Sequence, residues 1–183
     1  MAAPVESINT AFTRCDALLK LVNYARTRAF ANPKDDFSCE MFGIAKSENK
    51  GMALAKLNRI FDEIDGLIAH LTLLDIAAAF EKAFRESLKN AVGEARKIIH
   101  DQYNIPSLAE VREKLVRNVD KYEGLGTIEV LLEGYMEPEL LKALRLIREN
   151  RNNFAHGTDV KSPPTIFANQ AFAVLKKIAE DYL

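Results

Sequence analysis

The sequence predicts an all-α protein, built as an antiparallel bundle of helices. Glycine and proline are sparse, at 8 and 6 of 183 residues, and long segments rich in Leu, Ala, Glu, Lys and Arg run between them. Within those segments apolar residues recur every three or four positions, which is the period of an amphipathic helix. Strand-like patterns are nearly absent, and only residues 127–132 hold enough β-branched residues to leave a strand open.

The first third of the chain predicts two helices, over residues 5–30 and 47–64, after a frayed start at residues 1–4. The first helix should end near Asn32-Pro33, because proline disfavours the helical conformation in the residue before it. Residues 34–42 then form a loop. Asp65-Gly66 marks either a short break or only a weak point, since glycine has a low helix propensity.

The longest predicted helix covers residues 67–100 and would be about 50 Å long at about 1.5 Å per residue. A helix of that length allows a kink, for which Gly93 is the candidate position. It carries two apolar stripes, which predict burial on a wide face, as in the central helix of a bundle. The first stripe is Leu73, Ala77, Phe80, Phe84 and Ala91, and the second is Leu67, Leu71, Leu74, Ala78, Leu88 and Val92, interrupted by Glu81 and Arg85.

The last part of the chain predicts four more elements. A capping box at Ser107–Glu110 opens a helix to about residue 122, and residues 127–133 form a short turn or helix. Pro138 suits the first position of the next helix, and a last helix covers about 165–182. We expect one domain over residues 1–183, divided into an N-terminal helical extension (1–64) and a core (65–183).

Composition narrows the classes of function. A formal net charge of −1 does not indicate a broadly basic nucleic-acid binder, so any RNA would have to bind a local patch. The two cysteines, Cys15 and Cys39, form neither a disulfide framework nor a zinc site. No signal peptide or membrane span is evident, which favours a cytoplasmic protein without a membrane role. The sequence has no glycine-rich phosphate loop and no metal motif, and we expect no cofactor and no metal.

One stretch concentrates the residues that carry chemistry. The helix from residue 139 has apolar residues at Leu140, Leu144, Ile147 and Phe154, and the position missing from this stripe is Arg151. A guanidinium buried without a partner is costly, so Arg151 must be paired, face a cavity or face a partner subunit. Five residues later His156 lies in the last turn of the helix, followed by Gly157, a favoured residue just beyond a helix end.

Arg151-Asn152-Asn153-Phe154-Ala155-His156 resembles the R-x(4–6)-H motif of HEPN domains, in the version with Asn directly after Arg. The resemblance is specific over about residues 138–157 and fainter over about 67–96. It implies a HEPN-type helical bundle and a metal-independent endoribonuclease that acts as a homodimer, with two motifs facing each other across a two-fold axis. It further implies products with a 2′,3′-cyclic phosphate and a 5′-hydroxyl. Many such proteins act as toxins restrained by an antitoxin, or in phage defence.

The resemblance also assigns candidate roles. His156 would transfer protons, since imidazole titrates near neutrality, and Arg151 would hold the phosphate with its planar fork. Asn152, four residues before His156, could orient the imidazole or the phosphate, and Arg148 could make a second phosphate contact. Glu81 resembles the polar residue that an earlier HEPN helix lends to the active centre. In a regular helix Arg151 and His156 lie about 140° apart, so their convergence needs local unwinding or a long reach by the arginine.

Several alternatives stay open at this point. Glu81 could pair with Arg85, Arg151 could pair with a carboxylate such as Glu81, and His156 could only cap its helix. The chain could then be a HEPN-like interaction or regulatory module without catalysis, or a bundle that binds a small ligand near Glu81. His70 and His100 have no flanking constellation and are expected to be structural or surface residues. Basic residues between 85 and 121 could form an RNA groove, although interleaved glutamates favour solvated helix faces.

Overall fold

The computed structural model describes residues 2–102, 124–157 and 166–183, and within these ranges every regular element is a helix. The all-α prediction is therefore confirmed for this part of the chain. The helices are α1 (Ala2–Ala31), α2 (Asp36–Phe42), α3 (Lys50–Gln102), α5 (Leu125–Leu132), α6 (Pro138–Ala155) and α7 (Ala168–Tyr182).

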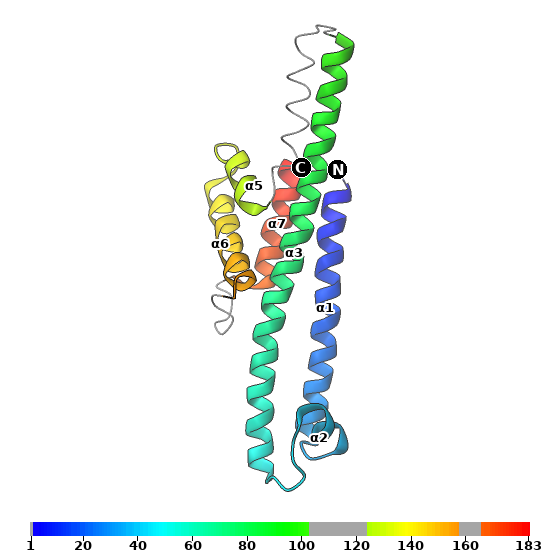
Figure 1. Cartoon of the computed structure of the whole chain (residues 1–183), viewed down its shortest axis with the longest axis vertical. Coiled ribbons are helices and arrows are strands. Elements are labelled where there is room, and N and C mark those ends of the chain that lie inside the picture. The colour runs from blue at the N-terminus through cyan, green and yellow to red at the C-terminus, as the bar shows by residue number, and fades with distance from the viewer. Residues whose placement is uncertain (1, 103–123, 158–165) are drawn as a thin grey trace.

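Two long helices form the frame of the molecule. Figure 1 shows α1 and α3 side by side along the longest axis, with α6 and α5 on one side of α3. Helix α7 contacts α1, α3 and α6, so it lies between the long pair and the helix that carries the arginine–histidine motif. At the far end of the pair only the short α2 and its connections accompany α1 and α3.

The main core is formed where five helices meet. It is a cluster of buried apolar side chains to which every described helix except α2 contributes. Its largest members include Ile8, Leu73, Ile76, Phe80, Ile128, Leu144, Ile147, Leu175 and Ile178. A smaller cluster, made of Ala29, Ile44, Ala53, Leu57 and Phe61, closes the other end of the α1–α3 pair. These two clusters hold α3 fixed along most of its length.

The two predicted helices 47–64 and 67–100 form one continuous helix, α3, and the helix does not break at Asp65-Gly66. A glycine inside a helix costs about 1 kcal/mol relative to alanine. Burial of Phe61 and Ile68 on either side exceeds that cost, since each buried large apolar side chain contributes about 1.5–3 kcal/mol. The division into an extension (1–64) and a core (65–183) stays a prediction, and α3 runs unbroken through that boundary.

The predicted loop 34–42 contains a helix, α2, which sequence reasoning missed. The carboxylate of Asp35 accepts a hydrogen bond from the backbone N–H of Ser38 at 2.7 Å, an N-cap that also lowers the pKa of Asp35. Gly43 ends the helix in the left-handed conformation at φ 63°. A capped helix of 7 residues is too short for the apolar period to identify.

The later elements follow the predictions more closely. The short segment at 127–133 is helical, as α5, and Pro138 is the first residue of α6. The last helix begins at Ala168 rather than near residue 165, and the first begins at Ala2 rather than after a frayed start. The helix predicted over residues 107–122 lies outside the described residues. Among the described helices, none has a stretch apolar and long enough to span a membrane.

The two stripes of α3 have different environments. Leu73, Ala77, Phe80 and Phe84 of the first stripe are buried, as predicted, whereas Ala91 of that stripe is exposed. In the second stripe Leu88 packs partly buried against the main core, but Leu67, Leu71 and Ala78 stay exposed. The prediction of burial on a wide face was therefore wrong for the first half of the second stripe, which the described helices cover incompletely.

Gly66 offers a direct test of the continuous helix. A Cβ built at this position meets nothing within 4 Å, so Gly66→Ala should stabilise the protein by about 0.5–1 kcal/mol through helix propensity alone. Urea unfolding followed by circular dichroism would measure the change. Gly43→Ala is the matched control and should lower stability by about 1–2 kcal/mol, because its left-handed backbone disfavours any side chain. A destabilised Gly66→Ala would contradict the continuous helix.

Candidate functional site

Arg151 lies at the edge of the core, where α6 faces α3. Its neighbour in the stripe, Ile147, is fully buried, while the side chain of Arg151 is 33% exposed. Nη2 donates to Oε2 of Glu81 on α3 at 3.2 Å, and Nη1 donates to Oδ1 of Asn152 at 3.0 Å. The charge that interrupts the apolar stripe is thus paired within the chain, one of the three solutions expected from the sequence.

Glu81 connects three helices. Its side chain is 12% exposed; one oxygen binds Arg151, and the other accepts the backbone N–H of Leu125 at 2.9 Å. Leu125 is the first residue of α5, and Gly124 before it has no side chain with which to cap the helix. Glu81 therefore supplies the cap from α3, and its negative charge is favourable at a helix N-terminus. The alternative in which Glu81 pairs with Arg85 is not the arrangement found.

A second buried carboxylate, Glu129 of α5, lies next to this group. Arg148 Nη1 approaches its Oε2 to 2.7 Å, and Arg145 Nε donates to its Oε1. The contact with Arg148 is ionic rather than a directed hydrogen bond, because Oε2 has no hydrogen-bond partner in the described structure. The bond from Arg145 raises the pKa of that guanidinium. Three arginines and two buried glutamates thus join α6 to α3 and α5.

Sequence reasoning missed Glu129 and Arg145. The available signal was the composition of residues 125–132, in which Glu129 is the single charged residue among apolar ones. A carboxylate inside such a short apolar helix is buried as soon as the helix packs, and it then needs cationic partners. The partner helix could not be identified from the sequence, since residues 145 and 148 become neighbours of residue 129 only in the folded chain.

An open pocket of about 500 Å³ lies over these pairs, between the start of α5 and the second half of α6. The α6 side is lined by two arginines, one glutamate and two asparagines (Arg148, Arg151, Glu149, Asn152 and Asn153), and the α5 side by Gly124, Leu125 and Gly126. A Cβ at Gly126 would lie 3.6 Å from Arg148, an ordinary contact distance, so this arginine lies directly beside the start of α5. Two guanidinium groups and a side-chain amide around an open pocket are suited to a phosphate or another oxyanion.

His156 lies outside this pocket. Helix α6 stays regular to Ala155, and His156 follows it as an exposed residue whose backbone N–H donates to Asn152 O at 2.9 Å. The local unwinding that would bring the imidazole to Arg151 does not occur. Within one chain, the structure brings together Arg151, Asn152, Glu81 and Arg148, and it leaves His156 at the end of the same helix.

The other histidines take separate positions. His70 is buried on α3, and its ring stacks on Phe154 of α6 with centroids 4.6 Å apart and planes 2° apart. This stacking closes the apolar stripe one turn beyond Arg151, which agrees with the structural role expected for His70. The side chain of His100 lies outside the described residues. In the ranges that the structure describes, no three His, Cys, Asp or Glu side chains gather as metal ligands would.

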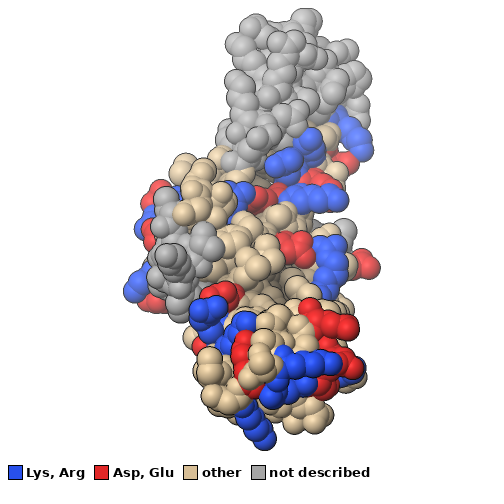
Figure 2. Space-filling model, turned by 60° about the horizontal axis from the view of Figure 1, so that its bottom comes forward, with Lys and Arg blue, Asp and Glu red and all other residues tan. Residues whose placement is uncertain are grey.

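The face of the molecule drawn in Figure 2 carries both signs of charge. Figure 2 shows Lys and Arg interspersed with Asp and Glu over the face turned to the viewer, with no wide area of one sign. This agrees with the formal net charge of −1. No protein-family model, curated protein or solved structure matches this chain. A function can therefore be inferred from the residues and their geometry alone.

The bridge through Glu81 predicts a large and specific effect on stability. Glu81→Ala leaves Arg151 without its acidic partner and α5 without its cap, and should cost about 2 kcal/mol, less than a fully buried pair because Arg151 is partly solvated. Urea unfolding would measure this. Glu86→Ala on the same helix removes only an exposed contact with Lys82 at 3.9 Å and should cost less than about 0.5 kcal/mol. Equal costs for the two variants would contradict a bridging role for Glu81.

Proposed function

We propose that this chain is a homodimeric, metal-independent endoribonuclease of the HEPN type that cuts single-stranded RNA. The observation that carries the proposal is the position of Arg151. It interrupts a core stripe, lines an open pocket with Arg148 and Asn152, and precedes His156 on the same helix. That arrangement fits the HEPN motif that residues 151–156 resemble, and the all-α architecture is compatible with a HEPN-type bundle.

The pocket supports binding of one RNA phosphate. The guanidinium of Arg151 is oriented by Glu81 and Asn152, yet a third of the side chain stays accessible. Arg148, on the same wall and 32% exposed, adds a second permanent positive charge. Arginine suits this task because it can hold two phosphate oxygens at once and keeps its charge at every physiological pH. A site so small also fits a protein without a broad basic surface.

The proposed reaction is an internal phosphoryl transfer. A base removes the proton of the ribose 2′-hydroxyl, the 2′-oxygen bonds to phosphorus, and the bond to the 5′-oxygen breaks. An acid gives a proton to the departing 5′-oxygen, so the products are a 2′,3′-cyclic phosphate and a 5′-hydroxyl. Imidazole can act as this base and as this acid, whereas the arginines stabilise the charge on the phosphate oxygens.

A composite site accounts for the separation of His156 from the pocket. Each chain has one His in the motif, and in a single chain it does not line the pocket that holds Arg151. Two copies would together supply two imidazoles and two sets of arginines, as the resemblance implies. By the same resemblance, we propose a cytoplasmic role as a toxin or in antiphage defence, restrained by a separate antitoxin or another regulatory protein.

One observation favours a second function. Both terminal nitrogens of Arg151 already have partners within the chain, Glu81 and Asn152, as expected if the arginine is purely structural. The chain would then be a HEPN-like interaction or regulatory module without catalysis. This alternative predicts a folded protein that cleaves no RNA under any condition, and no toxicity on expression.

Cleavage of single-stranded RNA in EDTA separates the two functions. Wild type should cleave, and His156→Ala should lower the rate about 10²–10⁴-fold, the usual contribution of a proton-transferring residue. Arg151→Ala should lower it at least as much, and Arg151→Lys should restore only part of the activity. Lys142→Ala, which removes an exposed cation from the same helix, is the matched control and should leave the rate unchanged.

These variants also separate catalysis from folding. His156 is exposed and its hydrogen bond comes from its backbone, so His156→Ala should unfold at the same urea concentration as wild type. Cleavage that persists in both Arg151→Ala and His156→Ala would overturn the assignment of the site. A folded wild-type dimer that cuts none of several RNAs would favour the interaction module.

The chemistry of the products gives an independent check. Because the 2′-oxygen is the proposed nucleophile, a single 2′-deoxy substitution at the cut nucleotide should abolish cleavage there and leave other sites unaffected. The downstream fragment should accept a 5′-phosphate from a kinase without prior phosphatase treatment. Cleavage at the deoxy-substituted position would exclude internal transfer and point to attack by water.

A further inference from the structure

Four exposed leucines lie on the side of the α1–α3 pair that α7 does not cover. Leu67 and Leu71 of α3 are 46% and 42% exposed, and Leu18 and Leu21 of α1 are 41% and 64% exposed. Arg14 pairs with Asp75 and Arg26 pairs with Asp65, so in this antiparallel pair Leu18 is level with Leu71. Monomeric proteins rarely expose contiguous apolar patches of this kind without a partner.

The surface has the spacing of a helix–helix seam. Leu67, Leu71, Leu74 and Ala78 follow one another at steps of four, three and four residues, the heptad rhythm by which two helices pack side by side. Beside the seam, Arg14 and Asp75 neutralise each other, so this pair leaves little net charge to select a charged partner. An apolar helix of the same rhythm fits this surface, and a second copy of the chain presents one.

We propose that a second copy of this chain docks here through a two-fold axis centred on α3 between Leu71 and Leu74. The four seam residues are symmetric about that point. Antiparallel pairing places Leu71 of one copy opposite Leu74 of the other, and Leu67 opposite the small Ala78. This proposal names the surface through which the two copies of the proposed nuclease meet. It rests on the proposed function only for its expected effect on RNA cleavage.

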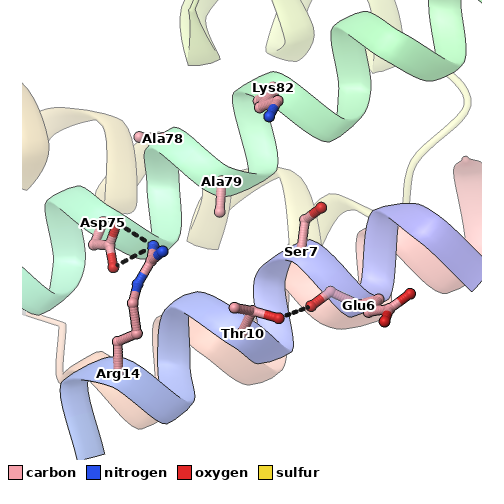
Figure 3. Close-up of a pocket in the computed structure, with 8 residues that line it drawn as sticks. All are labelled: Glu6, Ser7, Thr10, Arg14, Asp75, Ala78, Ala79 and Lys82. Carbon is pink, nitrogen blue, oxygen red and sulfur yellow. Dashed lines mark hydrogen bonds and ion pairs between the residues drawn. The ribbon is translucent and has the colours of Figure 1, made fainter.

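Shape supports this register. An open hollow of about 530 Å³ lies between α1 and α3; Ala78 and Ala79 line its α3 side, and the rest of its lining is polar or charged. Figure 3 shows Arg14 reaching from α1 to Asp75 on α3 across the hollow, and Ala79 directed toward α1. By the levels set above, Leu21 lies slightly closer to the start of α3 than Leu71 does. The two-fold axis therefore brings Leu21 of the second copy to within about two residues of the level of Ala78, beside the hollow.

Charge supports it as well. Glu63 lies before the seam, exposed, with only a loose 3.9 Å contact to Arg59. Arg85 lies beyond it at a seam position, and its buried Nε has no hydrogen-bond partner among the described residues. In the proposed register, Glu63 of one copy and Arg85 of the other differ in level by three residues, about 4.5 Å at 1.5 Å per residue. Both side chains can span that offset.

The test is the mass of the chain in solution, measured by light scattering and sedimentation without RNA. Wild type should have twice the mass of one chain, and Leu71→Glu should raise the dissociation constant of the dimer at least about thirtyfold. Val130→Glu, an equally polar change at an exposed apolar residue of α5, should leave the dimer intact. Because Leu71 is already half-exposed, the variant should keep its helical circular dichroism.

Charge reversal tests the register separately. Glu63→Lys should weaken the dimer about three- to tenfold, whereas Asp62→Lys, one residue away and turned about 100° around the helix, should not. In a Cys39→Ser background, Leu71→Cys should be cross-linked by a short bis-maleimide and Val130→Cys should not. A monomeric wild type, or a dimer that Leu71→Glu leaves intact, would overturn the proposal.

The outcomes also distinguish this inference from the nuclease. If the wild-type dimer cuts no RNA but is dissociated by Leu71→Glu, the proposed interface is supported and the nuclease function is rejected. If Leu71→Glu stays dimeric and still cuts RNA, the proposed interface is rejected and the nuclease function is supported. If both hold, Leu71→Glu loses cleavage in proportion to the loss of dimer, and raising the chain concentration restores it.

Discussion

The Glu81 carboxylate is the contact on which the arrangement around the site depends. It is held on α3, binds the Arg151 guanidinium of α6 with one oxygen and caps α5 with the other. Without it, an arginine at the edge of the core would lack an acidic partner and an eight-residue helix would begin with unsatisfied N–H groups. Because two helices meet on one side chain, the position of α5 and the orientation of Arg151 are fixed together.

This coupling explains how a nearly neutral protein can place two arginines beside one pocket. The arginines of α6 would repel one another and would be poorly solvated if they were simply set against α3 and α5. Glu81 and Glu129 offset their charge from the buried side, which leaves the outer faces of Arg148 and Arg151 directed to the pocket. Such pairs add little stability relative to apolar side chains, but removing one partner is costly, so each arginine is held in one orientation, which the proposed phosphate site requires.

The α1–α3 pair has a different character from the site. One side of it is sealed by α7 into a dense core, and the other exposes leucines at the rhythm of a seam. Among the described helices, α1, α5, α6 and α7 contact α3, and together they leave part of its surface exposed. A second copy of the chain is the partner that we propose for this surface. The same spacing of four and three residues, continued toward the C-terminus of α3, reaches Glu81 and Arg85. An interface on this face of α3 would therefore lie next to the candidate site.

The sequence by itself determined the secondary structure class, the motif helix and the presence of a misplaced charge at residue 151. These are local properties: helix period, proline at the first turn and glycine after the last turn each act within a few residues. It could not separate one long helix from two at Gly66, because the cost of a glycine is decided by burial on both sides. Nor could it show that α2 exists, since its cap and its end are each single residues.

Only the tertiary structure decided which partner Arg151 takes, that Glu129 and Arg145 join the site, and which stripe of α3 is buried. Each depends on residues far apart in the chain, such as 81 and 151 or 129 and 148, whose proximity is set by helix packing. A periodic pattern tells how many faces of a helix are apolar, but not how many neighbours are available to cover them. The free energy of burial is a property of the whole bundle, and it is assigned to individual residues only once the helices have met.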